Sequence, residues 1–189
     1  MAFSDQLLPL ENTVAHTHGP TGKHVHDDLA FTVWLDPELA AAQAIAIHAA
    51  LVKLLPDQAE TLNTNLAALT SDLWALHTEL TETLASTAQQ QIIYSHPVYQ
   101  YLDRRYGLNG MAVHWEPDEM PSEKEFEKLQ GMDGALMIWE AEPLPEISDR
   151  LTSMGIRSVV FNPCATQPKT GDYLTVMQAN LQSLKSTVP

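Results

Sequence analysis

Histidines gather near the start of the chain, in the stretch HTHGPTGKHVHDD at residues 16–28. Four of the eight histidines of the chain lie there: His16, His18, His24 and His26. Imidazole is the commonest protein ligand for zinc and similar metals. The two histidines of each pair are two positions apart, so an extended backbone points both to the same side. The stretch predicts a metal-capturing loop of modest affinity, since closing a flexible loop costs entropy; a solvated linker is the alternative.

Further polar residues follow four short apolar runs in the second half of the chain. Each run precedes a helical pattern, and the runs span residues 91–95, 110–115, 135–140 and 157–162. Strand-then-helix units predict an α/β fold with a four-stranded parallel sheet and flanking helices. The carboxyl ends of parallel strands meet at one edge, where ligands bind. The candidate ligands at these ends are His96, His114, Glu116 and Asn162.

Imidazoles mixed with carboxylate and amide oxygens are the donors that a zinc or manganese site uses. The sequence therefore predicts a metal site at this edge, with hydrogen-bonded structural histidines and a solvated acidic turn as the alternatives. His48 lies in an apolar helical pattern and His77 stands one position past a leucine seam, so packing or exposure explains both. Neither is included in the predicted site.

Two long helices are predicted ahead of the sheet. Asp36 is a helix N-cap candidate, Pro37 suits the first helical position and Pro56 ends the pattern. A second helix carries leucines every three or four residues from Leu62 to Leu84, so the two helices should form an antiparallel hairpin. The predicted organisation is a His-rich arm or loop at 1–30, a long helical hairpin at 31–88 and an α/β lobe at 89–189.

The composition narrows the class of partner. The 189 residues carry a formal net charge of −14, which disfavours nucleic acids and anionic membranes. Cys164 is the single cysteine, so no internal disulfide can form. No apolar run is long enough to cross a bilayer and the start lacks the pattern of an export signal, so we expect a soluble chain. Sequence motifs of hydrolases and of nucleotide-binding loops are also absent.

Several stretches together resemble the zinc/manganese solute-binding proteins of bacterial ABC transporters. They are TVWLDPELAAAQAIAIHAAL, YSHPVYQYLDRRYGLNG, IWEAEPLPEISDRL and GDYLTVMQANLQSL. The resemblance implies a fold of two α/β lobes joined by a long rigid helix, with the metal between the lobes and a His-rich loop before the helix. Since the chain matches from that loop onward, we expect only the carboxy-terminal lobe, a truncated form of the family protein.

The resemblance also implies a function. A member of this family is no enzyme: it binds a divalent cation, Zn²⁺ or alternatively Mn²⁺, outside the cytoplasmic membrane, in the periplasm, and delivers it to a membrane permease. Of the family ligands, His96 is retained, and His114 or Glu116 matches another. Thr32 stands where the family has histidine and Asn162 where it has aspartate.

These two replacements support an alternative function, a degenerate protein-interaction module without high-affinity metal binding. A zinc hydrolase with Glu140 as its base is the third and weakest hypothesis. We further expect the His-rich arm to lend an imidazole to the site. Without a second lobe, apolar surface around Trp34, Trp115 and Trp139 should be exposed and should favour a homodimer.

Overall fold

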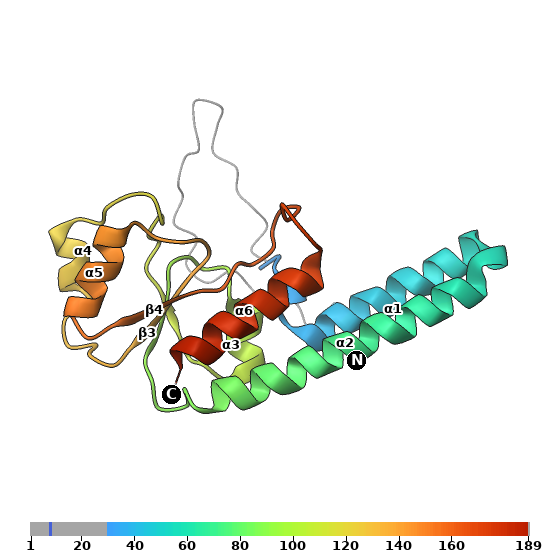
Figure 1. Cartoon of the computed structure of the whole chain (residues 1–189), viewed down its shortest axis with the longest axis horizontal. Coiled ribbons are helices and arrows are strands. Elements are labelled where there is room, and N and C mark those ends of the chain that lie inside the picture. Colours follow the sequence, from blue (N-terminus) through green and yellow to red (C-terminus); the bar gives the residue numbers. More distant parts are fainter. Residues whose placement is uncertain (1–7, 9–29, 189) are drawn as a thin grey trace, which may run out of the picture.

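The computed structural model describes residue 8 and residues 30–188, in which an α/β lobe carries a long helical hairpin projecting from one side (Figure 1). The lobe contains a four-stranded sheet in the order β2-β1-β3-β4, with every strand pair parallel. The strands are β1 (Ile92–Tyr94), β2 (Met111–Ala112), β3 (Leu136–Trp139) and β4 (Arg157–Val160). The predicted fold class is confirmed, although each strand is shorter than its apolar run.

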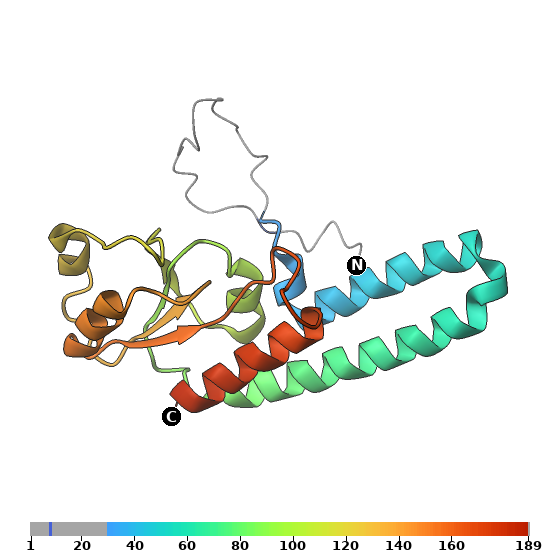
Figure 2. The ribbon, with the colours of Figure 1, turned by 45° about the horizontal axis from the view of Figure 1, so that its top comes forward.

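Six α-helices flank or extend this sheet in the described part of the chain. They are α1 (Pro37–Leu54), α2 (Ala59–Ala85), α3 (Gln100–Tyr106), α4 (Glu123–Glu127), α5 (Pro145–Ser153) and α6 (Tyr173–Thr187). Short 3₁₀ turns precede and follow α1, at Val33–Leu35 and Pro56–Gln58. Helices α1 and α2 run side by side as the projecting hairpin, and α6 packs along the near half of α2 (Figure 2).

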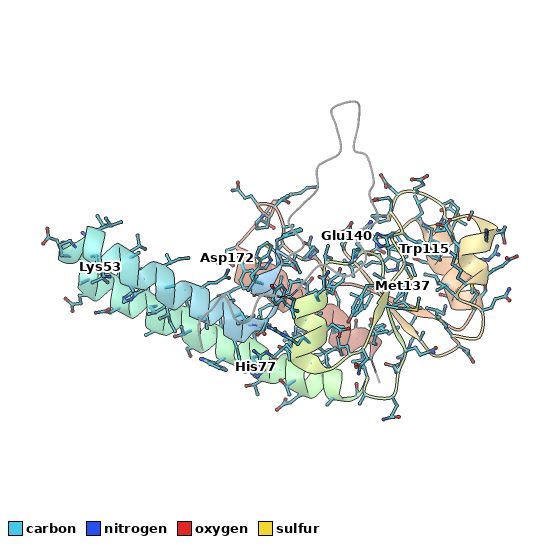
Figure 3. All side chains as sticks on the ribbon, turned by 180° about the vertical axis from the view of Figure 1, so that it is seen from behind. Lys53, His77, Trp115, Met137, Glu140 and Asp172 are labelled. Atoms are coloured by element: carbon cyan, nitrogen blue, oxygen red, sulfur yellow. The ribbon has the colours of Figure 1, made fainter. Side chains whose placement is uncertain are left out.

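The alternation of side chains along the strands divides the core into two layers. Ile92 and Tyr94 of β1 contribute to the layer that packs against α2, α3 and α6. Ile93 lies between them in sequence and contributes to the opposite layer, with α4 and α5. Met137 and Trp139 of β3 join this second layer (Figure 3 labels Met137). Both faces of the sheet are thus covered, which explains why its strands read as continuous apolar runs.

The helix signals of the sequence operate as expected at the start of α1. The Asp36 carboxylate accepts hydrogen bonds from the backbone N–H groups of Glu38 and Leu39, and Pro37 occupies the first turn. The first helix ends just before Pro56, whose ring cannot continue it. In the lobe, α3 ends at Gly107, which has a φ of 63° and forms a left-handed C-cap.

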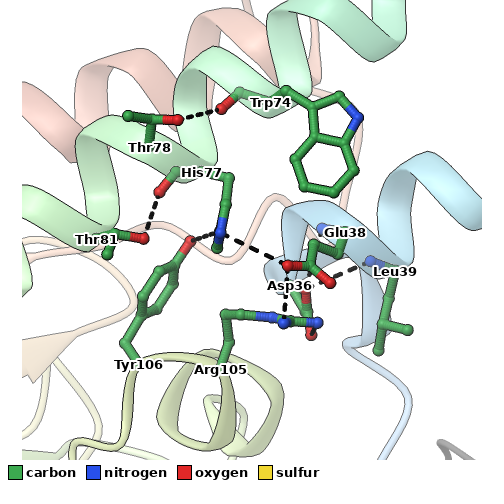
Figure 4. Close-up of polar contacts among 9 residues, drawn as sticks. All are labelled: Asp36, Glu38, Leu39, Trp74, His77, Thr78, Thr81, Arg105 and Tyr106. Carbon is green, nitrogen blue, oxygen red and sulfur yellow. Dashed lines mark hydrogen bonds and ion pairs between the residues drawn. The ribbon is translucent and has the colours of Figure 1, made fainter.

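Charged side chains fasten the base of the hairpin to the lobe (Figure 4). Arg105 of α3 forms ion pairs with Asp36 at 2.8 Å and with Glu38 at 3.0 Å. His77 of α2 lies 3.6 Å from Glu38 and shares a hydrogen bond with the Tyr106 hydroxyl at 3.3 Å. Burial opposes the charge of Arg105, but the hydrogen bond and charge of Asp36 raise its pKa above the ordinary value. These contacts connect both helices of the hairpin with α3 of the lobe.

The expectation of exposed tryptophans is wrong for two of the three. Trp115 is 3% exposed and Trp139 is fully buried, because both pack in the layer formed with α4 and α5. Trp34 is half-buried and its indole N–H donates to the Pro163 carbonyl. Within residues 30–188, none of the helices combines the length and the apolar character that crossing a membrane requires.

Candidate metal centre

Three side chains with metal-binding atoms converge at the carboxyl edge of the sheet. His96 follows β1, Glu116 follows β2 and Glu140 follows β3 directly. One donor atom from each lies within 4.8 Å of the other two, a spacing that allows a shared ion. Figure 3 labels Glu140 on this edge, near Trp115. The three side chains therefore form a candidate metal centre.

The strand order explains why these loops meet. From β1 the chain passes to β2 on one side, then crosses to β3 on the other side of β1. Neighbouring loops after β1 and β3 therefore leave the sheet toward opposite faces, since α3 and α5 pack on opposite layers. A crevice at such a switch point is the usual ligand site of open parallel sheets. His96 and Glu140 are the residues that border it.

Each glutamate lies at the distance of a neighbouring ligand from one nitrogen of His96, but the two glutamates face different nitrogens. Glu116 Oε1 lies 3.3 Å from His96 Nε2, and Glu140 Oε1 lies 3.3 Å from His96 Nδ1. Ligand atoms bound to zinc at about 2.0–2.1 Å in a tetrahedron are themselves about 3.3 Å apart. Only one nitrogen of the His96 ring can bind the ion. The glutamate that faces the other nitrogen must therefore rotate toward the ion. The cluster offers one nitrogen and two oxygen ligands, fewer than the about four of a closed zinc site.

Burial distinguishes the members of the cluster. The His96 side chain is 18% exposed, that of Glu140 is 30% exposed and that of Glu116 is 53% exposed. His96 Nδ1 is buried and makes no geometrically sound hydrogen bond, although Glu140 lies beside it. A buried polar atom without a hydrogen bond is costly and calls for a partner. Glu140 faces this nitrogen, and a cation held between the two would satisfy both groups.

His114 lies beside the cluster. Its ring meets that of His96 edge-on, with 6.2 Å between the ring centroids. The backbone of His114 has a φ of 60°, in the left-handed region that is uncommon for residues other than glycine. The hydrogen bonds to the first strand continue on both sides of it, from Val113 and Trp115. His114 is therefore held by its neighbours in a kink that turns it toward His96.

The burial of Tyr99 and its interaction with the charge of Glu140 bear on the electrostatics of the cluster. Burial, followed by the negative charge of Glu140, raises the pKa of Tyr99 well above its ordinary value. Its hydroxyl donates to the Phe161 carbonyl at 2.7 Å. Tyr99 therefore stays neutral below the carboxylates and supports the edge without adding to their negative charge.

The two positions where the sequence departs from the family pattern have structural partners. Thr32 is 1% exposed and its hydroxyl donates to the Val98 carbonyl at 2.5 Å. The side-chain oxygen of Asn162 accepts the backbone N–H of Cys164, and its backbone pairs with the Asn180 amide. Both residues thus stabilise the segments that border the sheet edge. Their hydrogen bonds in the described part of the chain go to residues other than His96.

The structure brings together only some of the predicted site residues. His96, His114 and Glu116 lie at one place, as the shared sheet edge predicts. His16, His18, His24 and His26 lie outside the described residues. Glu140 was missed as a ligand, although it is the first polar residue after the third strand. Its position directly after a strand is the sequence feature that could have identified it as a ligand. The strand order places β3 beside β1, and so makes Glu140 the neighbour of His96.

Comparisons with known proteins show the family to which the chain belongs. A family model described as zinc-uptake complex component A, periplasmic, matches residues 1–187. The zinc-binding lipoprotein AdcA of Streptococcus pneumoniae is 30% identical over 183 residues, covering 91% of this chain and 36% of AdcA. The zinc uptake protein ZnuA of Yersinia pestis is 28% identical over 100 residues, covering 51% of this chain and 31% of that protein. The chain thus spans about a third of the length of these relatives.

Solved structures show the same fold. The Zn(II)-bound ZnuA-like domain of S. pneumoniae AdcA matches with a TM-score of 0.74 and 25% identity, covering all of this chain and 69% of that domain. The metal-dependent lipoprotein YcdH of Bacillus subtilis also gives 0.74, with 26% identity over 85% of this chain and 65% of YcdH. The sheet, the hairpin and these likenesses define one lobe of a solute-binding protein. Within that class, the chain belongs to the family of zinc-uptake complex component A.

Proposed function

We propose that this chain binds a divalent zinc ion as cargo, as the metal-binding lobe of a solute-binding protein without catalytic activity. The observation that carries the proposal is the convergence of His96, Glu116 and Glu140 within 4.8 Å at the switch point of the sheet. Imidazole nitrogen with carboxylate oxygen is a donor set suited to Zn²⁺, and Mn²⁺ is the alternative cargo. Its relatives include zinc-binding and zinc-uptake proteins, which supports the same metal.

The place of this chain in transport is part of the proposal. A solute-binding protein of an ABC transporter delivers its ion to a membrane permease outside the cytoplasmic membrane, and we assign this chain the same role. The description of its family as periplasmic supports that location. We also retain the division into an arm at 1–30, a hairpin at 31–88 and a lobe at 89–189.

The arm histidines complete the proposed site. The backbone N–H of Ala30 donates to the Leu8 carbonyl at 2.9 Å, so the two described residues that flank segment 9–29 are tied together. The Leu8 N–H in turn donates to the Tyr101 hydroxyl on α3. We propose that a histidine between these two residues lends its imidazole to the cluster of three ligands. His16, His18, His24 and His26 are thus the proposed additional donors.

The test is zinc titration against a competing chromophoric chelator. To separate the two parts of the site, each variant is made in the natural chain and in a chain with the four arm histidines replaced by alanine. Loss of the cluster imidazole in His96→Ala should weaken zinc binding by at least about tenfold in both backgrounds. His48→Ala is the matched control, because that histidine contacts Asn63 on the exposed hairpin.

Equal zinc affinity of the natural chain, His96→Ala and His48→Ala would contradict the cluster as the binding site. Absence of measurable zinc binding would instead favour the protein-interaction module, in which Thr32 and Asn162 serve only structure. Turnover of ester substrates would support the hydrolase hypothesis and contradict the proposal.

A further inference from the structure

The chain that leads into His96 is fixed by the sheet. Ser95, the residue before it, is fully buried. Its backbone N–H donates to the Ile138 carbonyl of β3 at 2.9 Å, and its carbonyl accepts the N–H of Trp115, which follows β2, at 2.8 Å. The backbone just before His96 is therefore held from both sides.

The three residues from His96 to Val98 form a tight turn. The Val98 N–H donates to the His96 carbonyl at 2.9 Å, which closes the turn around Pro97. A proline ring fixes its own φ at about −65° and favours an extended backbone at the residue before it, so it suits the centre of such a turn. The turn is stiff in itself, but contacts from outside must fix where it lies relative to the sheet.

Two side chains from outside the turn supply these contacts. The Thr32 hydroxyl donates to the Val98 carbonyl at 2.5 Å, and the Gln100 side-chain amide donates to the Pro97 carbonyl at 2.6 Å. Together with the Val98 N–H, they give each of the three carbonyls of the turn a hydrogen-bond donor. Thr32 is 1% exposed and Gln100 is half-buried, so the Thr32 bond is the better shielded from water.

The position of this turn matters because His96 is the nitrogen ligand of the candidate metal centre. Its side chain is also the least exposed of the three in the cluster. Metal binding requires ligand side chains to be held close to their productive positions by packing and hydrogen bonds. Replacing a residue that holds a ligand typically lowers metal affinity about 10–100-fold. A displaced turn would move the imidazole relative to both glutamates.

We propose that Thr32 is a positioning residue of the metal site: its hydroxyl, bonded to the Val98 carbonyl, fixes the turn that carries His96 and so raises the affinity for zinc. Thr32 acts through His96 and is not itself a ligand. This inference rests on the proposed function, since it concerns the same site. Thr32 precedes the 3₁₀ turn at Val33–Leu35, so the base of the hairpin supports the metal ligand.

The experiment measures the zinc affinity of the full chain by competition with a chromophoric chelator. Thr32→Val keeps the size of the side chain and removes the hydroxyl, so it should weaken zinc binding about tenfold. Thr32→Ser keeps the hydroxyl and should bind zinc nearly as the natural chain does. Gln100→Met removes the second donor to the turn and should weaken zinc binding to a smaller extent, because its bond is less shielded from water.

Thr87→Val is the matched control for Thr32→Val. Thr87 is 2% exposed and its hydroxyl also donates to a backbone carbonyl, that of Leu84 at 2.7 Å. It lies between α2 and β1, at the amino ends of the strands, which is the edge of the sheet opposite to His96. Urea denaturation without metal is measured in parallel. Both valine variants should lose stability, whereas only Thr32→Val should lose zinc affinity.

Four outcomes overturn the inference. Unchanged zinc affinity in Thr32→Val, with a loss in His96→Ala, refutes the role of Thr32 and leaves the proposed function standing. A loss in Thr32→Val that Thr87→Val or Thr32→Ser equals also refutes it, because the hydroxyl bond to the turn would not be the cause. If Thr32→Val does not fold, unchanged affinity in Gln100→Met refutes the dependence of zinc binding on a held turn. Equal zinc affinity of the natural chain and His96→Ala refutes the proposed function together with this inference.

Discussion

At the scale of single residues, the candidate site depends on carboxylates whose environments differ. Glu140 follows a fully buried strand residue and its side chain is 30% exposed, whereas that of Glu116 lies in an exposed turn and is 53% exposed. Charges that are less exposed to water interact more strongly with a bound cation, because they are screened less. The two glutamates should therefore contribute unequally to metal binding.

We predict that Glu140→Gln weakens zinc binding by about tenfold or more, and that Glu116→Gln weakens it by only about threefold. Isothermal titration calorimetry of the three proteins measures the difference. Glu142→Gln, an exposed glutamate of the same loop, is the control and should bind zinc as the natural chain does. A larger loss for Glu116→Gln than for Glu140→Gln would show that the exposed turn provides the principal ligand.

At the scale of elements, the junction between the hairpin and the lobe depends on one buried ion pair. Asp36 caps α1 and its side chain is 1% exposed, and Arg105 of α3 supplies the opposite charge at 2.8 Å. Glu38 accepts from the same guanidinium, and His77 of α2 stands beside it (Figure 4). Removing the cation leaves the Asp36 charge buried without an opposite charge, although its two backbone hydrogen bonds remain, and this is more costly than losing an exposed pair.

Arg105→Met should lower the free energy of unfolding by about 3 kcal/mol, because methionine keeps the packing volume but not the charge. Arg150→Met removes an exposed pair with Glu123 and should cost less than about 1 kcal/mol. Urea denaturation followed by circular dichroism gives both values. Equal, small losses would mean that water solvates Asp36 more than its burial indicates.

At the scale of the whole molecule, apolar surface is exposed on the hairpin rather than around the predicted tryptophans. Ile45, Ile47, Leu54 and Trp74 are each about half exposed or more. Residues 39–52 of α1 contain no charged side chain. Since a chain of charge −14 repels its copies, this uncharged face is the surface best able to approach a second copy. The burial of Trp115 and Trp139 removes the basis of the homodimer expected through the tryptophan face. A homodimer through the hairpin is a separate prediction, made from this uncharged face.

Light scattering at increasing concentration tests this prediction. The natural chain should approach the mass of a dimer, and Ile47→Glu should remain a monomer, because it places like charges in the interface. Met120→Glu alters a similarly exposed apolar residue of the lobe and should leave the dimer intact. A natural chain that stays monomeric throughout would contradict the prediction.

The sequence alone determined the parallel α/β class, the helical hairpin and the sheet edge on which His96 and His114 meet. These features follow from local rules: apolar runs alternate with helical patterns, Asp36 and Pro37 begin a helix, and parallel strands share a carboxyl edge. The family resemblance also followed from the sequence, and the family model confirms it.

Only the tertiary structure decided which residues face one another across that edge. The order β2-β1-β3-β4 places β3 beside β1, so Glu140 becomes the neighbour of His96, a pairing that no spacing along the chain reveals. Packing against α4 and α5 likewise buries Trp115 and Trp139, which sequence reasoning expected on the surface. The physical reason is that strand order and layer packing depend on contacts between distant segments, whereas helix caps and apolar periodicity depend on near neighbours.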